Sequence, residues 1–144
     1  GEDALYRGFR AMTDAYFDRH RAGDPEAIAT MIDFYGGPGT FAAWPPKVRA
    51  YAVVTTPVNL LDWAGAYGFA ISPATLMSID VPLLVLRGGA SPEAARRANE
   101  IVANAVRDAS LVTIPGAAHF MIATHASQVA KAIAGHVGRN GEPR

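Results

Sequence analysis

The sequence predicts an α/β fold in which helices come first and a parallel sheet follows. Two apolar runs, at residues 83–86 and 111–114, lack the alternation of a half-exposed strand. Such runs are typical of parallel strands that are buried on both faces. A helical pattern follows each run. From residue 80 onward we therefore expect the order strand, helix, strand, helix, with a right-handed crossover between the strands.

The first part of the chain is predicted to be helical. Residues 4–21 and 25–35 follow helical patterns, and the sequence Ala-Gly-Asp-Pro separates them. We expect Gly23 to end the first helix and Asp24 to cap the second, with a proline at its first position. A glycine-rich loop and a helix-like piece at 45–51 come next, and residues 55–78 read as less regular.

The two helices of the second part carry clear apolar faces. Ser91, followed by a proline, is the expected cap of the first of them. Residues of these helices that share one face are Ala94, Ala95, Ala98, Ile101, Val102, Ala105 and Val106 in the first and Val129, Ala130, Ile133, Ala134 and Val137 in the last. Both faces are expected to pack on the sheet.

Composition excludes several classes of protein. The 144 residues hold 13 Lys+Arg and 13 Asp+Glu, with no basic cluster, so a nucleic-acid partner is not expected. No apolar stretch is long enough to span a bilayer and no leader is evident, so we expect a cytoplasmic protein without a membrane partner. The absence of cysteine excludes disulfides, and no metal-ligand spacing occurs.

Residues 81–137 resemble the end of a serine hydrolase of the α/β-hydrolase superfamily. The second apolar run is followed by Gly116-Ala-Ala-His119, and that family carries its catalytic histidine in a Gly-x-x-His loop after its last strand. The resemblance implies a partial α/β-hydrolase fold. A helical cap would occupy residues 1–78, and β-α-β-α of the parallel core would occupy residues 79–144. It also implies that His119 is the general base.

The nucleophile of that family is missing from the sequence. No segment reads Gly-x-Ser-x-Gly, and the chain is short for the family and begins with Gly1. The resemblance therefore implies that the serine and the oxyanion hole lie on an amino-terminal hydrolase segment or on a partner chain. The strand at 83–86 would then have one unpaired edge, so we expect the chain to bind that complementary segment or to form a homo-oligomer.

The catalytic acid has no obvious position. The family often places an aspartate where this chain has Ser91. Three alternatives stay open: an acid upstream of this chain, which is favoured, then Glu93, which lies near the same sheet edge, and Asp62. Asp80 is excluded because it precedes its strand and so lies at the opposite end of the sheet from His119.

Two further segments resemble catalytic motifs of the hydrolase family. Ser91 follows Gly-Ala at a strand-to-helix turn, but the next residue is Pro92, which has no N–H to donate to an oxyanion. The sequence Gly36-Gly-Pro-Gly39 resembles the oxyanion loop of some hydrolases, but it follows a helix instead of a strand. We prefer to interpret Ser91 as a helix cap and the glycine-rich segment as a turn between helices.

Aromatic residues gather between positions 34 and 69. They are Phe34, Tyr35, Phe41, Trp44, Trp63, Tyr67 and Phe69. In the resemblance they belong to the cap and line an apolar pocket, although the same rings would also suit the core of a small lid. We therefore expect hydrolysis of an ester or related acyl bond of a small hydrophobic molecule, without a cofactor. The competing hypothesis is a non-catalytic binding or assembly module.

Overall fold

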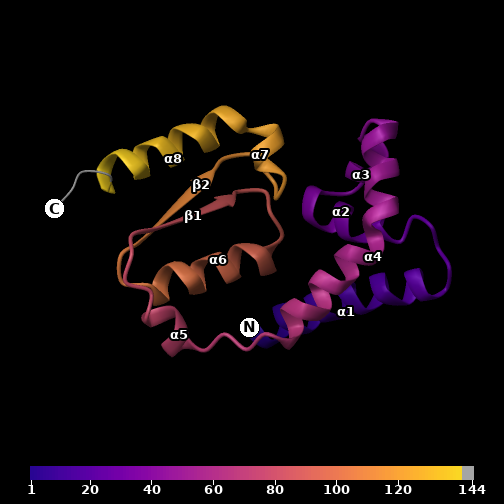
Figure 1. Ribbon diagram of the computed structural model, residues 1–144, viewed down its shortest axis with the longest axis horizontal. Coiled ribbons are helices and arrows are strands. Elements are labelled where there is room, and N and C mark those ends of the chain that lie inside the picture. Colours follow the sequence, from indigo (N-terminus) through magenta and orange to yellow (C-terminus); the bar gives the residue numbers. More distant parts are fainter. Residues whose placement is uncertain (141–144) are drawn as a thin grey trace. The chain divides into compact units, whose positions relative to one another are not determined.

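A computed structural model describes residues 1–140 of the chain (Figure 1). The chain divides into two compact units, Gly1–Ala70 and Ile71–Arg144. The described part of the first unit is helical, and the second combines helices with parallel strands. The predicted mixture of helix and parallel strand is confirmed.

The first unit contains four helices, α1 (Glu2–Arg21), α2 (Ile28–Gly36), α3 (Thr40–Ala43) and α4 (Pro46–Gly68). Gly23 follows α1 with a φ of +83°, the left-handed conformation that glycine adopts without a steric penalty. Asp24 accepts a hydrogen bond of 2.9 Å from the N–H of Glu26. It therefore caps the turn before α2, which begins three residues later than expected.

Helix α4 corrects the expectation of irregular structure after residue 55. It is continuous through Pro57, although proline inside a helix removes one backbone hydrogen bond. Two hydroxyls just before the proline bond to carbonyls of the preceding turn: Thr55 donates to Tyr51 O at 2.9 Å, and Thr56 donates to Ala52 O at 3.1 Å. These bonds hold both side chains against the turn that precedes Pro57.

The core of the first unit forms where its helices meet. Tyr16 is fully buried on α1, and its hydroxyl donates a 3.0 Å hydrogen bond to Asn59 Oδ1 on α4. Burial raises the pKa of Tyr16 to about 12, so the hydroxyl keeps its proton at neutral pH. The other buried apolar side chains of this unit are Ala27, Ile28, Met31, Ile32 and Phe41.

The second unit contains the predicted strands and helices. Its elements are α5 (Pro73–Met77), β1 (Leu83–Gly88), α6 (Glu93–Ala105), β2 (Ala109–Ile114), α7 (Met121–Thr124) and α8 (Ala126–Asn140). In the described residues β1 and β2 form a two-stranded parallel sheet, with Leu86 opposite Val112. Figure 1 shows α6 and α8 on opposite sides of these strands. The strands are parallel because α6 returns the chain to the starting end of the sheet.

The two faces of the sheet pack differently. On the α8 side, Ile114, Ala117 and Val129 form a small apolar core. On the α6 side, Arg87 donates to Thr113 Oγ1 at 2.9 Å and forms an ion pair with Glu100 at 2.6 Å. The hydrogen bonds from Arg87 and Arg97 hold the pKa of Glu100 below its ordinary value. This polar contact ties β1 to α6.

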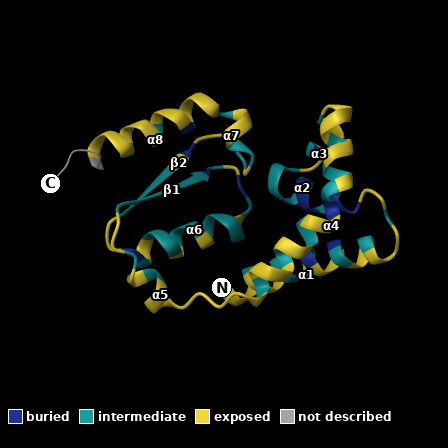
Figure 2. Ribbon diagram, in the orientation of Figure 1, coloured by how far each residue is buried: buried dark blue, intermediate teal, exposed yellow. Residues whose placement is uncertain are grey.

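Two expectations about these helices are wrong. Val129 is buried, but Ile133 and Val137 of the same α8 stripe are exposed, because the sheet is too narrow to cover the whole helix (Figure 2). Ser91 is not the cap of α6 either. The residue before the helix is Pro92, and within the described residues no side chain caps this end.

None of the helices in the described part of the chain is long and apolar enough to cross a bilayer.

Candidate functional site

The loop that carries His119 lies over the end of β1. After β2, Gly116 turns the chain with a φ of +71°, and Ala117 is fully buried. The carbonyl of Ala117 accepts a 2.8 Å hydrogen bond from the N–H of Ala90, which follows β1. His119 comes two residues later, just before α7. Both loops therefore meet at the carboxyl edge of the sheet, where parallel sheets bind ligands.

Gly88 makes this contact between the loops possible. A Cβ at this position would lie 2.5 Å from the carbonyl oxygen of Ala118 and closer still to that of Ala117. Backbone atoms cannot move aside as a flexible side chain can, so only glycine fits here. In the sequence, Gly88 stands directly after the first apolar run. A glycine at the end of a buried strand was the signal for this close approach.

The His119 imidazole stands at the surface beside Phe120. The two ring centroids are 5.7 Å apart, in an edge-to-face arrangement. His119 belongs to the exposed residues, yet neighbouring atoms remove part of the water around the ring. This desolvation lowers the pKa of His119 below its ordinary value. Desolvation thus favours the neutral imidazole, the form in which it can accept a proton.

We expect a proton NMR titration to show the lowered pKa of His119 directly. The Hε1 signal, assigned by its absence from a His119→Gln variant, should titrate below about 6.5, the ordinary value. In the urea-unfolded chain the His119 signal should return to that value, because unfolding restores the water around the ring. A native midpoint at or above the unfolded one would contradict the partial burial of this imidazole.

The alternatives for the catalytic acid occupy different parts of the chain. Glu93 is the first residue of α6 and is exposed, so it follows β1 at the sheet edge near which His119 lies. Asp62 belongs to α4, in the first unit. Asp80 precedes β1, at the opposite end of the sheet. Of the two acids considered within the chain, Glu93 and Asp62, only Glu93 follows β1 at this sheet edge. An acid upstream of the chain stays the favoured alternative, and nothing in the structure tests it.

Ser91 lacks the surroundings of a nucleophile. It is buried, with 7% of its surface exposed. The N–H groups of Gly89, Ala90 and Ser91 donate to the carbonyls of Ile114, Ala117 and Gly88, respectively, so the turn uses them internally. An oxyanion at Ser91 would find these donors engaged, and Pro92 has no N–H.

A fluorophosphonate probe should therefore leave this chain unlabelled. Such probes react with serines that are activated by a base and an oxyanion hole, and the backbone at Ser91 provides no free donors. Intact-mass spectrometry of the treated chain is the measurement, and a known serine esterase in the same tube shows that the probe is active. Covalent modification of Ser91 would contradict this reading of the turn.

The glycine-rich loop between α2 and α3 is a structural turn. Gly37 and Gly39 have φ values of +99° and +81°. The N–H of Phe41 donates to the Asp33 carboxylate at 2.8 Å, and that of Gly37 donates to the Asp33 carbonyl at 2.9 Å. These donors hold the turn together, which supports its interpretation as a corner instead of an oxyanion loop.

The predicted aromatic pocket residues fall into separate groups. Phe34, Tyr35, Trp63 and Tyr67 form one cluster with Phe9 of α1; Trp63 stacks on Tyr35 at 6.3 Å, and its centroid is 5.4 Å from that of Phe9. Phe41 is buried, Trp44 is partly buried, and Phe69 is 69% exposed. The clustered rings therefore pack on one another, and burial raises the pKa of Tyr35 to about 12.

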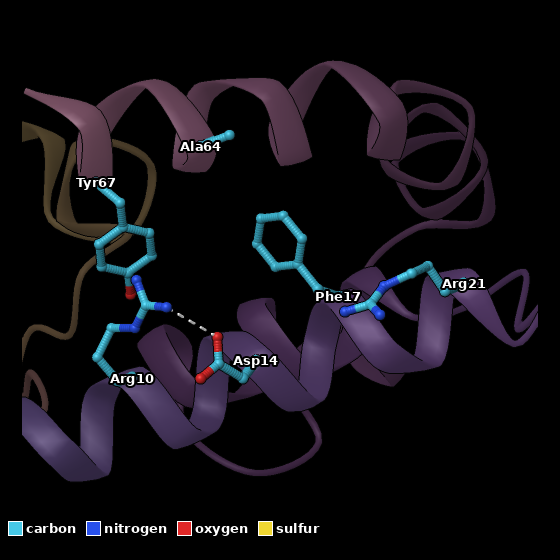
Figure 3. A pocket seen from close by; sticks show the side chains of 6 residues that line it. All are labelled: Arg10, Asp14, Phe17, Arg21, Ala64 and Tyr67. Atoms are coloured by element: carbon cyan, nitrogen blue, oxygen red, sulfur yellow. Dashed lines mark hydrogen bonds and ion pairs between the residues drawn. The ribbon is translucent and has the colours of Figure 1, made fainter.

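A pocket in the first unit lies between α1 and α4 (Figure 3). Its lining consists of Arg10, Asp14, Phe17, Arg21, Ala64 and Tyr67. The Arg10 guanidinium lies 4.0 Å from the centre of the Tyr67 ring and pairs with Asp14 at 3.2 Å. Of the predicted pocket residues only Tyr67 lines it. The four α1 residues repeat at helical spacing, and that periodicity was the available signal.

Within residues 1–140, no cluster of three or more His, Asp or Glu side chains is arranged to hold a metal ion.

Comparisons of the chain with protein-family models, with curated proteins and with solved structures gave no match.

Proposed function

We propose that this chain is the carboxyl-terminal portion of a serine hydrolase with an α/β-hydrolase fold, and that His119 is its general base. The observation that carries the proposal is the position of His119. It follows the second of two parallel strands, on a loop whose backbone is held against the end of β1 through Ala117 and Gly88. The lowered pKa of His119 supports the same role, because a general base must be unprotonated at the working pH.

The chemistry follows from an unprotonated imidazole at a sheet edge. His119 accepts the hydroxyl proton of a serine as its oxygen attacks the carbonyl carbon of an ester, and then donates this proton to the departing alcohol. Water, activated by the same imidazole, releases the acid from the acyl-enzyme. The serine and its oxyanion donors belong to a complementary amino-terminal hydrolase segment, and Glu93 or an acid of that segment orients the imidazole.

The substrate class is proposed from the composition of the first unit. The aromatic composition of residues 34–69 favours a small hydrophobic ester over a sugar or a nucleotide, although among these side chains only Tyr67 lines the pocket between α1 and α4. The reaction proceeds by acyl transfer and requires no cofactor. The cysteine-free sequence supports a cytoplasmic location, where disulfides are rare.

A non-catalytic assembly module is the second candidate. The observation that favours it is the row of exposed apolar side chains on α4, which includes Tyr51, Val54 and Leu61. Surfaces of this kind mark contacts with other proteins. An assembly module would bind its partner without changing the reactivity of any serine.

The experiment that separates these functions combines the chain with the segment encoded upstream of it. The complex is treated with a fluorophosphonate probe, and the modified peptide is sequenced by mass spectrometry. We expect label on a Gly-x-Ser-x-Gly serine of that segment only when the chain is present, and strongly reduced label with His119→Ala. Labelling that is independent of the chain, or unchanged by His119→Ala, would overturn the proposal.

A further inference from the structure

Helix α4 is apolar on two opposite faces. Its inner face is occupied within the first unit: Asn59 bonds to Tyr16, Trp63 packs on Phe9, and Tyr67 bonds to Thr13 at 2.6 Å. These residues and the buried Thr56 share one side of the helix. A helix that has only this inner contact is expected to be polar on its other side.

The outer face of α4 is instead a stripe of exposed apolar side chains. Tyr51, Val54, Val58 and Leu61 are spaced by three, four and three residues, so they follow one line along the helix. Their exposed fractions reach 77% at Val54 and 72% at Leu61, and Figure 2 shows exposed residues along this helix. Over these ten residue steps the stripe is about 15 Å long. We call these four residues the α4 stripe.

Charges at the two ends of the α4 stripe are complementary to each other. Only Lys47, Arg49 and Asp62 are charged in this helix, and Arg49 lies toward the inner face. The exposed Lys47 precedes the stripe and the exposed Asp62 follows it. A second copy packed antiparallel would place each Lys47 beside the partner's Asp62, whereas a parallel copy would place like charges together.

The same arrangement matches the apolar residues. An axis between positions 54 and 55 lies midway between Lys47 and Asp62, and it also lies midway between Tyr51 and Val58. One two-fold axis therefore pairs both charges and pairs Tyr51 with Val58, and it places Val54 close to the partner's Val54. This self-complementarity is the property of an isologous dimer interface.

We propose that the chain forms a symmetric homodimer through the α4 stripe, with the two α4 helices antiparallel. Burial of the stripe removes its apolar side chains from water, and the Lys47–Asp62 pairs select the orientation. The occupant of this face is a second copy of the same chain. The unpaired edge of β1 offers a different route to association, and the variants below separate the two.

The test measures association by light scattering coupled to gel filtration, with the full chain at micromolar concentration. We expect the mass of two chains. Val58→Glu should raise the dissociation constant of the dimer by at least about 30-fold, because it puts a charge into the centre of the contact. The matched control is Val137→Glu, since Val58 and Val137 are both 59% exposed on a helix, and this variant should remain dimeric.

Unchanged circular dichroism of both variants would show that they are folded. A wild-type chain at the mass of one copy would overturn the proposal. A dimer that survives Val58→Glu would also overturn it and would assign association to another surface, such as the β1 edge.

Charge reversal tests the orientation. Lys47→Glu alone and Asp62→Lys alone should each weaken the dimer by about 3- to 30-fold, because each creates two like-charge contacts. The double variant should regain the original affinity, since the antiparallel pairs are restored with their signs exchanged. Additive weakening in the double variant would contradict the antiparallel contact.

Cross-linking gives an independent measure, because the natural chain contains no cysteine. A mixture of Tyr51→Cys and Val58→Cys chains should form a mixed disulfide dimer under mild oxidation, and Tyr51→Cys alone should not. Cross-linking of Tyr51→Cys with itself and not with Val58→Cys would indicate parallel helices and overturn the proposed geometry.

Discussion

Replacing His119 by Ala should abolish nearly all ester hydrolysis by the complex of this chain with its serine-bearing segment. The loss of the histidine of a catalytic triad costs roughly 10⁴- to 10⁶-fold in kcat, because the serine then has no base to accept its proton. The measurement is the initial rate on a chromogenic ester of a short fatty acid. The expected loss lies mainly in kcat, since the imidazole acts on the reacting atoms and not on the body of the substrate.

His125 supplies the matched control for this prediction. It lies between α7 and α8, six residues after His119, and its Nδ1 is 2.9 Å from Thr124 Oγ1. His125→Ala removes an imidazole from the same part of the chain without removing the proposed base, so we expect most of the activity to remain. Full activity of His119→Ala, or equal losses in both variants, would refute the assignment of the base.

The largest expected effect on stability is that of Gly88→Ala. The added methyl group would overlap the backbone carbonyls of Ala117 and Ala118, so the His119 loop must move away from β1. We expect a loss of about 3 kcal/mol in the free energy of unfolding of the second unit. That loss corresponds to a fall in Tm of roughly 12–24 °C for a unit of this size.

The next residue provides the control. A Cβ at Gly89 would lie 3.5 Å from the carbonyl oxygen of Ile114, an ordinary contact, so Gly89→Ala should change stability by less than about 1 kcal/mol. Far-UV circular dichroism follows the whole chain, whereas tryptophan fluorescence reports only the first unit, where Trp44 and Trp63 lie. In Gly88→Ala only the dichroism transition should shift. Equal stability of the two alanine variants would contradict the close approach at Gly88.

Local patterns predicted the second unit well. Apolar runs without alternation identified β1 and β2, and the helical periodicities identified α6 and α8, because these signals depend on neighbours within a few residues. Prediction failed where a local rule was overridden. Residues 55–78 were expected to be less regular, but α4 continues through Pro57 to Gly68, with Trp63 and Tyr67 packed against α1.

At the candidate site, too, some features follow from the local sequence and others only from tertiary contacts. The position of His119 after the second strand follows from the order of residues alone, since a parallel strand must end at the carboxyl edge of its sheet. The lowered pKa of His119 and the need for glycine at position 88 depend on atoms distant in sequence, so no local pattern contains them. The aromatic residues between 34 and 69 were evident as a group. Their partner Phe9 belongs to α1 and became apparent only through packing.

The sequence by itself predicts the order of helices and strands in the second unit, the parallel direction of the strands and the position of the histidine loop. Short-range periodicity and chain connectivity govern these features. Which apolar faces are buried depended on three-dimensional contacts. The α8 stripe was expected to pack on the sheet, yet Ile133 and Val137 are exposed, and so is the apolar outer face of α4. Periodicity shows that a helix has an apolar face, whereas burial requires another surface to meet it, and that surface lies far away along the chain or on another molecule.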